Sequence, residues 1–388
     1  MKYILVALGC ILFALLAPPA SASELKSPDG NLVVDFEFKD FGLDHDCPSY
    51  RITYKGREVL KDSRLGLELE QGPLVANFEV AGEARTQANQ TWTPVCGERS
   101  PIPDHYNQLA IDLRETQSPR RMVRVAFRAY DEGLAFCYTL PQQANLKDFT
   151  INAERTQFHF GGDVTTWAVY TAQADYTHAE VPLSQVKPGA ERPFTVRIAD
   201  DLYASITEAR CVDYARMKLR PAKDQPNTLE AFLNAERGVA GKVTGVTPFT
   251  SPWRVVMVAD SPGKLLEHNY LIPTLNDPCA PADTSWIKPG KVIREVTLTT
   301  AGSKACVDFC LARGLQYIEL DSGWYGSERD PRSDATAVDP KRAARLDLQE
   351  VIRYANAHGI GVILYVNQKA LEQQREVLFP LYEKWGVK

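Results

Sequence analysis

The chain has 388 residues, of which 44% are hydrophobic and 24% charged, and its formal net charge at pH 7 is −5. These values are ordinary for a globular protein, and the length is enough for two domains with sizeable cores. The mild acidity and the lack of a basic stripe exclude nucleic acid from the predicted partners.

The first 22 residues have the layout of a secretory signal peptide. Lys2 provides a positive start, residues 4–17 form an apolar run, and Ala20-Ser21-Ala22 is a small-residue cleavage site. The apolar run, at about 14 residues, is shorter than the ~20 that a membrane-spanning helix needs. We therefore predict cleavage before Ser23, a secreted or periplasmic mature chain, and no membrane span once the leader is removed.

Seven cysteines lie beyond this leader, namely Cys47, Cys96, Cys137, Cys211, Cys279, Cys306 and Cys310. Their odd number and scattered spacing are unlike a disulfide scaffold, so most are expected to be reduced and buried. Cys47 and Cys96 are the one pair considered for a bridge. Cys306 and Cys310 lie four residues apart on a predicted helix, but no other Cys or His stands at a zinc-site spacing. Buried thiols are therefore favoured over metal ligands.

Residues 23–272 show the two-residue alternation of β-strands. Leu65, Leu67 and Leu69, for example, alternate with glycine and glutamate. Such alternation, broken by turns that contain glycine and aspartate, indicates antiparallel strands with one buried face. Because no long helical pattern interrupts it, we predict an N-terminal β-sandwich of two packed sheets.

Residues 273–284 are rich in proline and aspartate and are predicted to be a linker. After them, residues 285–388 alternate between strand and helix patterns, which is typical of parallel βα units. The predicted strands are 291–296, 315–320 and 360–366, and the predicted helices are 303–313, 348–358 after the N-cap Asp347, and 371–385 before Gly386. The first of these helices is expected to bury Ala305, Cys306, Phe309 and Cys310.

Three parallel strands with two bare edges would not make a good domain by themselves. The pattern therefore predicts either a small open sheet or the first three βα units of a (β/α)8 TIM barrel, and a stop just after a helix-ending glycine favours a truncated barrel. On this interpretation the chain alone is expected to be inactive and poorly stable.

Polar and aromatic residues follow two of the predicted strands, at the end where barrels carry their functional groups. Asp321 follows the second strand, Trp324 lies three residues further on, and Asn367 follows the third strand. A carboxylate, a planar ring and an amide around one opening suit the hydroxyls and the apolar face of a sugar. The alternative is that Asp321 caps a turn while Trp324 covers the barrel rim.

Other motifs with a known chemistry are absent. There is no phosphate-binding loop, zinc-protease helix, zinc-type Cys/His cluster or nucleophile elbow. His178 and Glu180 lie close together, but this spacing alone favours a surface loop over a site.

The order of several short segments resembles glycoside hydrolase family 97. The segments are Thr91-Trp92-Thr93-Pro94, Tyr106-Asn107, the hairpin Phe127-Arg128-Ala129-Tyr130-Asp131-Glu132-Gly133-Leu134-Ala135-Phe136, Ile206-Thr207-Glu208-Ala209, Asp213-Tyr214, Ser285-Trp286-Ile287-Lys288-Pro289-Gly290-Lys291, Glu319-Leu320-Asp321-Ser322-Gly323-Trp324 and Lys384-Trp385-Gly386-Val387-Lys388. Together they span nearly all of the mature chain.

The resemblance implies an N-terminal supersandwich, a central (β/α)8 barrel and a small C-terminal β-domain. It also implies a calcium ion at the site and exo-acting hydrolysis of α-glucosides or α-galactosides of oligosaccharides by paired carboxylates.

The sequence departs from the family pattern in three ways. The catalytic carboxylates that the resemblance implies belong to strand four or later, and the chain stops at Lys388 before them. Cys137 stands where the hairpin usually carries arginine. Thr177 is aligned with a calcium-binding glutamate of the family, so Glu180 is the candidate metal ligand in its place.

Two alternatives to an intact glycosidase stay open at this point. One is a degenerate family member that binds sugar without cleaving it. The other is an enzyme of a different class, with a sandwich fused to an open α/β domain, although no glycine-rich phosphate loop supports it. The sequence leaves open which sugar is bound, whether hydrolysis is retaining or inverting, and the oligomeric state.

Overall fold

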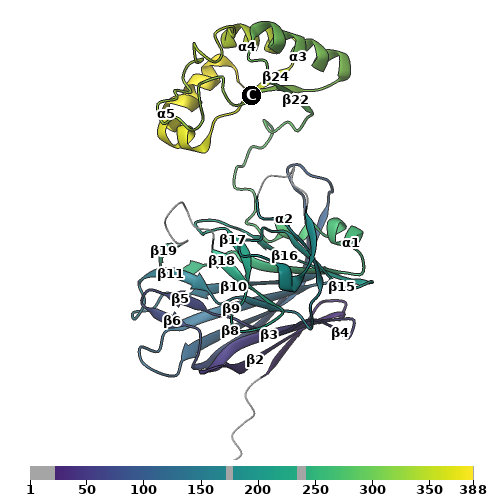
Figure 1. Cartoon of the computed structure of the whole chain (residues 1–388), viewed down its shortest axis with the longest axis vertical. Helices are drawn as coiled ribbons and strands as arrows, with labels where there is room; N and C mark the ends of the chain where they lie inside the picture. Colours follow the sequence, from purple (N-terminus) through teal and green to yellow (C-terminus); the bar gives the residue numbers. More distant parts are fainter. Residues whose placement is uncertain (1–21, 172–177, 234–241, 388) are drawn as a thin grey trace, which may run out of the picture. The chain divides into compact units, whose positions relative to one another are not determined.

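The computed structural model describes residues 22–171, 178–233 and 242–387, so the expected signal peptide lies outside it except for Ala22. The chain forms two compact units, and the boundary between them in the sequence lies between Ala280 and Pro281 (Figure 1). This boundary falls within the segment 273–284 that was expected to be a linker. None of the helices in the described ranges is long and apolar enough to cross a membrane.

The first unit consists almost entirely of β-strands. Its strands are β1 (Ser23–Lys26), β2 (Leu32–Phe41), β3 (Asp44–Tyr54), β4 (Arg57–Arg64), β5 (Leu67–Leu69), β6 (Gly72–Leu74), β7 (Phe78–Trp92), β8 (Ile102–Glu115), β9 (Met122–Tyr130), β10 (Gly133–Leu140), β11 (Asp148–Glu154), β12 (Gln157–His159), β13 (Thr165–Ala168), β14 (Ala179–Pro182), β15 (Phe194–Ala199), β16 (Leu202–Ala209), β17 (Met217–Pro221), β18 (Thr228–Leu233), β19 (Val243–Val246), β20 (Phe249–Thr250) and β21 (Trp253–Ala259). Its helical segments are a 3-10 turn (Leu183–Gln185), α1 (Pro262–Glu267) and α2 (Leu271–Thr274). The expectation of strands without long helices is therefore confirmed for the described part of this unit.

All strand pairings of the first unit are antiparallel, as the alternating pattern predicted. The largest sheet has the order β14-β13-β15-β16-β21-β10-β9-β8-β7, with β20 paired to the end of β10. The smaller sheets are β1-β2-β3-β4, β19-β11-β5-β6 and β12-β18-β17. The prediction of only two sheets was too simple, because several short sheets share one hydrophobic core with the largest sheet.

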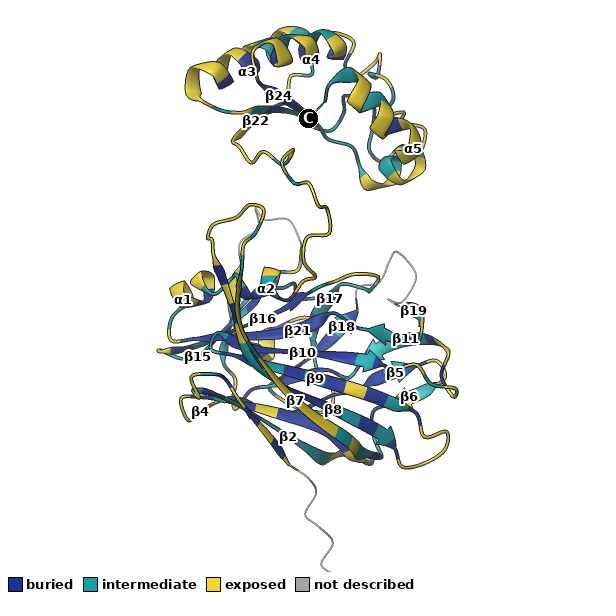
Figure 2. Cartoon of the chain, turned by 180° about the vertical axis from the view of Figure 1, so that it is seen from behind, coloured by how far each residue is buried: buried dark blue, intermediate teal, exposed yellow. Residues whose placement is uncertain are grey.

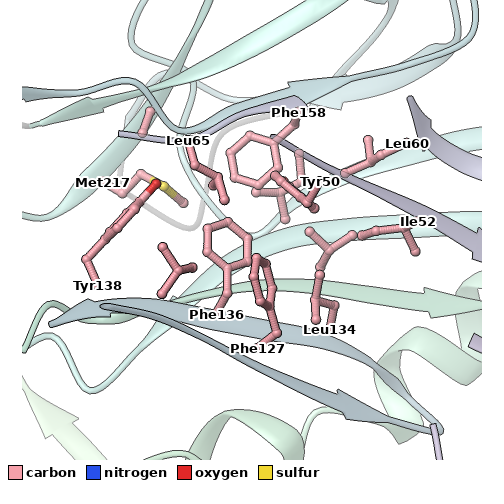
Figure 3. Close-up of a cluster of buried hydrophobic side chains, with 14 of the residues drawn as sticks. Tyr50, Ile52, Leu60, Leu65, Phe127, Leu134, Phe136, Tyr138, Phe158 and Met217 are labelled. Carbon is pink, nitrogen blue, oxygen red and sulfur yellow. The ribbon is translucent and has the colours of Figure 1, made fainter. Parts of the chain in front are cut away.

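The centre of this core is made by aromatic rings from facing strands (Figure 3). The Tyr50 ring of β3 lies 5.0 Å from the Phe136 ring of β10, and Phe36 of β2 lies 6.1 Å from Phe127 of β9, measured between centroids. All four side chains are fully buried. Truncating one such phenylalanine to alanine typically costs about 3–5 kcal/mol of unfolding free energy.

The largest sheet is buried on both faces at its centre, which the sequence pattern did not predict. Every residue of β10 except Thr139 is buried, and Figure 2 shows this strand mostly in dark blue. Side chains on the second face, among them Ala135 and Cys137, form a separate cluster with Leu265 of α1 and Leu271 of α2. Because the two short helices cover this face, the strand loses the polar side expected of a half-exposed sheet.

The second unit contains a parallel sheet of order β22-β23-β24, flanked by three helices. Its elements are β22 (Val292–Glu295), α3 (Thr300–Arg313), β23 (Tyr317–Leu320), α4 (Leu348–Ala357), β24 (Gly361–Leu364) and α5 (Gln368–Trp385). The three predicted βα units are confirmed, although each strand is shorter than predicted. Closure into an eight-stranded barrel stays a prediction, since the described residues supply three strands of this sheet.

The helix ends follow their local sequence signals. The Asp347 carboxylate accepts a hydrogen bond from the Glu350 backbone N–H (2.9 Å) and so begins α4. Gly314 and Gly386 end α3 and α5 in the left-handed conformation, with φ of 67° and 78°. Both C-cap positions were predicted, because glycine adopts this conformation without the strain that a Cβ would cause.

The buried face of α3 differs from the predicted one. Ser303, Val307 and Cys310 are buried, whereas Ala305 is exposed and the Phe309 side chain is 45% exposed. Apolar residues lie around much of this helix, so the sequence did not select one stripe. By contrast, α4 buries the regularly spaced residues Leu348, Val351, Ile352 and Ala355.

The seven cysteines in the described ranges are free thiols, and fewer of them are buried than expected. Cys47, Cys137 and Cys310 are buried and Cys306 is half-buried, but Cys96, Cys211 and Cys279 are exposed. The considered bridge between Cys47 and Cys96 is absent, since one thiol lies within β3 and the other in the exposed loop after β7. Burial raises the pKa of the Cys47 thiol to about 11, which keeps it protonated and unreactive near neutral pH.

Candidate functional site

Asp321 lies at the carboxyl end of β23, where the parallel sheet opens into its longest connection. Its carboxylate forms an ion pair with the Arg294 guanidinium of the neighbouring strand β22. The Asp321 side chain is 17% exposed, and the Arg294 side chain is much more open at 63%. Asp321 is thus paired with a cation on the next strand, whereas the alternative interpretation expected it to cap a turn.

Trp324 is a core residue, which corrects the expectation that its ring faces an opening. The side chain is fully buried, and its indole Nε1 donates to the Tyr365 carbonyl oxygen at 2.8 Å. The rings of Tyr325 and Tyr382 pack around it, with centroids 5.2 and 6.3 Å away. Because the loop after β23 folds back under α5, neither face of the indole is free to stack on a sugar.

Asn367 begins α5 and also binds the long loop after β23. Its side-chain Oδ1 accepts from the Lys369 backbone N–H (3.0 Å), while its Nδ2 donates to Glu328 Oε2 (3.3 Å). Its backbone N–H donates to the Tyr325 hydroxyl at 2.9 Å. The predicted site amide is therefore present at the sheet edge, with its side chain engaged in a helix cap.

Glu328 is a polar group at this edge that sequence reasoning did not select. It accepts hydrogen bonds from the Tyr365 hydroxyl (2.7 Å) and from Asn367, both of which are neutral donors. The hydrogen bond to Glu328, followed by burial, raises the pKa of the Tyr365 phenol. The long loop contains several acidic residues. No local sequence signal distinguished Glu328 from the others, because its hydrogen-bond partners lie outside the loop.

The other acidic residues of this loop form local turns. Asp330, Asp334 and Asp339 each accept a hydrogen bond from a backbone N–H two residues later, at 2.7–2.9 Å. Such turns are the usual role of aspartate in loops. The adjacent Arg332 side chain lowers the pKa of Asp330 to about 2.

The sheet register places these groups at one edge. Leu320 of β23 pairs with Leu364 of β24, and the Tyr365 N–H donates to the Leu320 carbonyl at 3.0 Å. Asp321, directly after β23, and Asn367, three residues after the end of β24, therefore both lie at the carboxyl end of the sheet. Carboxylates accept from hydroxyl groups and the Asn367 amide and Arg294 donate, so the edge can bind a polyhydroxyl ligand.

Glu180, the candidate metal ligand, lies on β14 at the margin of the largest sheet. Its side chain is 58% exposed, and its nearest charged partner is the Arg197 guanidinium at 3.8 Å. Calcium takes about 6–8 oxygen ligands, and no group of three or more His, Cys, Asp or Glu in the described ranges could hold a metal. Calcium binding therefore stays a prediction, and the aligned position Thr177 lies outside the described residues.

His178 is exposed and contributes to the wall of a cavity of about 590 Å³ in the first unit. The same cavity is lined by Glu191, Arg192 and Glu208. His178 and Glu180 are therefore surface residues, as the spacing suggested, and His178 adjoins a charged recess.

That recess opens from a buried ion network that joins several strands. Arg254 of β21 and Glu154 of β11 are fully buried, with Arg254 Nε 3.1 Å from Glu154 Oε2. Arg254 Nη1 also binds Glu208 Oε2 at 2.5 Å, and the Tyr214 hydroxyl donates to Glu154 Oε1 at 2.5 Å. Glu208 and Tyr214, which belong to the segments that carry the family resemblance, thus take part in this buried network.

Comparison with known proteins assigns both units to one family. Residues 25–278 match the family model described as glycosyl-hydrolase 97 N-terminal, and residues 286–388 match the model described as glycoside hydrolase 97. Over the full chain, the sequence is 26% identical to a retaining alpha-galactosidase of Bacteroides thetaiotaomicron, of which it covers 62%. It is also 26% identical to a probable retaining alpha-galactosidase of Streptomyces bingchenggensis, with 87% of the chain and 52% of that protein aligned.

Solved structures give a consistent result. A glycoside hydrolase family 97 enzyme from Pseudoalteromonas sp. strain K8, in complex with panose, superposes with a TM-score of 0.84 and 26% identity. The match covers 94% of this chain and 58% of that enzyme. A beta-arabinopyranosidase shares the fold with a TM-score of 0.76 at 21% identity. The chain thus spans between half and two thirds of the length of these relatives.

Proposed function

The chain belongs to glycoside hydrolase family 97, and from this membership we propose that it is the N-terminal part of an α-glycosidase. The parent enzyme would remove terminal α-galactosyl or α-glucosyl groups from oligosaccharides. The observation that carries this proposal is that both family models match, in chain order, residues 25–278 and 286–388. Both aligned relatives are called retaining or probable retaining alpha-galactosidases, which favours the α-galactosyl group.

We further propose that residues 285–388 are the first three βα units of a (β/α)8 barrel. The sheet β22-β23-β24 is parallel throughout, and each strand is followed by a helix. In barrels of this kind the functional groups lie at the carboxyl ends of the strands. Asp321, Glu328 and Asn367 lie at that end here, so they would bind sugar hydroxyls.

The carboxylates that break the glycosidic bond are expected beyond Lys388, as the family resemblance implies. Retaining glycosidases place an acid/base and a nucleophile about 5–5.5 Å apart. The described residues of this chain supply groups that would hold and orient the sugar, and no cleavage step is assigned to them. Calcium is implied only by the family resemblance, and no step of the proposal depends on it.

Secretion or periplasmic export also belongs to the proposal, on the basis of the leader pattern in residues 1–22. The second candidate function is sugar binding without hydrolysis. Its specific support is Cys137, which stands where the family hairpin usually carries arginine. Cys137 is buried on the second face of β10, where burial raises its thiol pKa to about 12, so it is no chemical substitute for a cation.

The test is an assay with nitrophenyl α-galactoside and α-glucoside. The 388-residue chain is expected to give no turnover above a buffer blank, whereas the same chain extended through a complete barrel should hydrolyse at least one substrate. Turnover by the 388-residue chain would refute the placement of the catalytic carboxylates. A folded, extended protein that binds the sugars without cleaving them would support the second candidate instead.

A further inference from the structure

A second cavity, of about 870 Å³, is lined entirely by residues of the first unit. Side chains from several strands line it, among them Gln90 and Trp92 of β7, Asp104 and Tyr106 of β8, Arg128 of β9 and Trp253 of β21. The segment 273–279 closes another side. Its volume falls within the range of about 300–1,000 Å³ that is common for small-molecule sites. We call it the sandwich pocket.

The strand register explains why these side chains meet. Gln90 pairs with Asp104 and Tyr106 with Tyr130, so each pair points to the same face of the sheet. Residues two apart on one strand also share a face, which adds Trp92 to Gln90 and Arg128 to Tyr130. This face lies opposite to the main core of the sandwich. The packing of that core therefore does not account for the polar groups gathered on it.

Asp104 is unusual among these residues because it is a buried carboxylate without a cation. It is 8% exposed, and it accepts hydrogen bonds from Gln90 Nε2 (2.9 Å) and from the Tyr130 hydroxyl (3.3 Å). None of the ion pairs in the described ranges involves it. An ionised carboxylate has about four acceptor sites, and burying it without enough donors is costly. A ligand that brings hydroxyl donors would satisfy the remaining sites.

Arg128 is held in the same pocket by two aromatic rings. Its guanidinium carbon lies 4.3 Å from the Tyr106 ring centroid and 4.7 Å from that of Trp253. Its Nε donates to the Gln108 side chain at 2.8 Å, and no carboxylate forms an ion pair with it within the described ranges. Stacking fixes the plane of the guanidinium, so its donors have a defined direction before any ligand binds.

The charges of the pocket indicate a neutral ligand. Asp104 and Asp277 are balanced by Arg128 and Arg210, and the Arg210–Asp277 pair (3.0 Å) is already formed at the rim. Trp92 adds an aromatic wall whose indole Nε1 is fixed by Thr274 Oγ1 at 3.1 Å. A carboxylate acceptor, a fixed guanidinium donor and an aromatic surface match the hydroxyls and the apolar face of a saccharide.

We propose that the sandwich pocket binds a neutral oligosaccharide. None of the groups used in the proposed function lines it, so this inference depends on the first unit alone. A bound oligosaccharide would be retained on the protein without being cleaved there. Hydrolysis requires a pair of carboxylates, and of the two that line the pocket Asp277 is held in an ion pair with Arg210.

The proposal is tested by calorimetric titration of the 388-residue chain with the neutral trisaccharides raffinose and panose. Asp104→Asn keeps the size of the side chain but removes its charge, and it should raise the dissociation constant about tenfold. The matched control is Asp112→Asn on the same strand, because Asp112 pairs with Arg124 (2.7 Å) and does not line the pocket. Thermal unfolding verifies that both variants fold.

A second variant and two further titrations keep the test decisive. Trp92→Leu should also weaken binding, while the control Asp112→Asn should not. Glucuronate should bind no more tightly than glucose. The proposal is overturned if neither trisaccharide binds the folded chain, if Asp104→Asn and Trp92→Leu leave the affinity unchanged, or if glucuronate binds more tightly than glucose.

Discussion

Glu328 and Tyr365 form the hydrogen bond that most directly reports the geometry of the polar sheet edge. The carboxylate accepts from the phenol and repels the phenolate, so the pKa of Tyr365 is raised. Glu328→Gln removes the negative charge and should lower this pKa toward the ordinary value of about 10. Spectrophotometric titration, with Tyr365→Phe to identify the signal, measures it.

The matched control is Asp330→Asn, since Asp330 interacts with Arg332 in its own turn. It should leave the Tyr365 titration unchanged. If Glu328→Gln also left the titration unchanged, Glu328 would not be held at the sheet edge and its proposed role in sugar binding would fail.

Arg254 is the residue on which the buried network of the sandwich depends. Arg254→Leu would leave Glu154 and Glu208 buried without their cation, which typically costs about 3–5 kcal/mol of unfolding free energy. Urea unfolding measures this change. Arg124→Leu breaks the exposed pair with Asp112 and should cost less than about 1 kcal/mol. Equal losses in the two variants would mean that the network contributes nothing specific.

Sequence reasoning located the polar edge better than it assigned its residues. Asp321 and Asn367 follow adjacent strands, and parallel pairing places both at the same end of the sheet. The burial of Trp324 depends on how the loop after β23 folds against α5, and no local pattern encodes that contact. Glu328 was missed for the same reason, because its partners Tyr365 and Asn367 are almost 40 residues away in sequence.

At the scale of elements, the hairpin between β9 and β10 depends on Gly133. Its φ is 154°, and a Cβ there would lie 2.8 Å from Met257 Cα and would also contact the Val256 carbonyl oxygen. Gly133→Ala should therefore destabilise the first unit by about 1–3 kcal/mol through the clash, beyond the backbone strain. Gly30→Ala is the control, since Gly30 also has positive φ but open space around it. Denaturant midpoints that shift equally would contradict the clash.

Elements with strong local signals were predicted well, and those shaped by tertiary packing were not. Asp347 and Glu350 mark the start of α4, and the residues Asp131 to Gly133 mark the hairpin between β9 and β10. The burial of the second face of β10 follows from α1 and α2, which are too short to be recognised from periodicity. The buried stripe of α3 was wrong because its apolar residues do not lie on one side.

At the scale of the whole molecule, the change of hydrophobic period near residue 280 predicted the division into two units. The family assignment rests on matches to both units, which cover nearly all of the chain from residue 25 onward. The activity itself is a property of proteins that are longer than this chain, and it is proposed here for the parent enzyme. The sheet β22-β23-β24 connects the family assignment with the proposed activity, because it carries the groups that would hold the sugar.

Calorimetry of sugar binding by the protein extended through a complete barrel tests this central claim most directly. Asp321→Ala should weaken the binding of the cognate sugar by about 1–3 kcal/mol, the loss of charge-assisted hydrogen bonds, without unfolding the protein. Asp339→Ala, which removes a carboxylate that accepts from local amides, should leave the affinity unchanged. Unchanged affinity in a folded Asp321→Ala variant would show that Asp321 is structural and that the sugar site lies elsewhere.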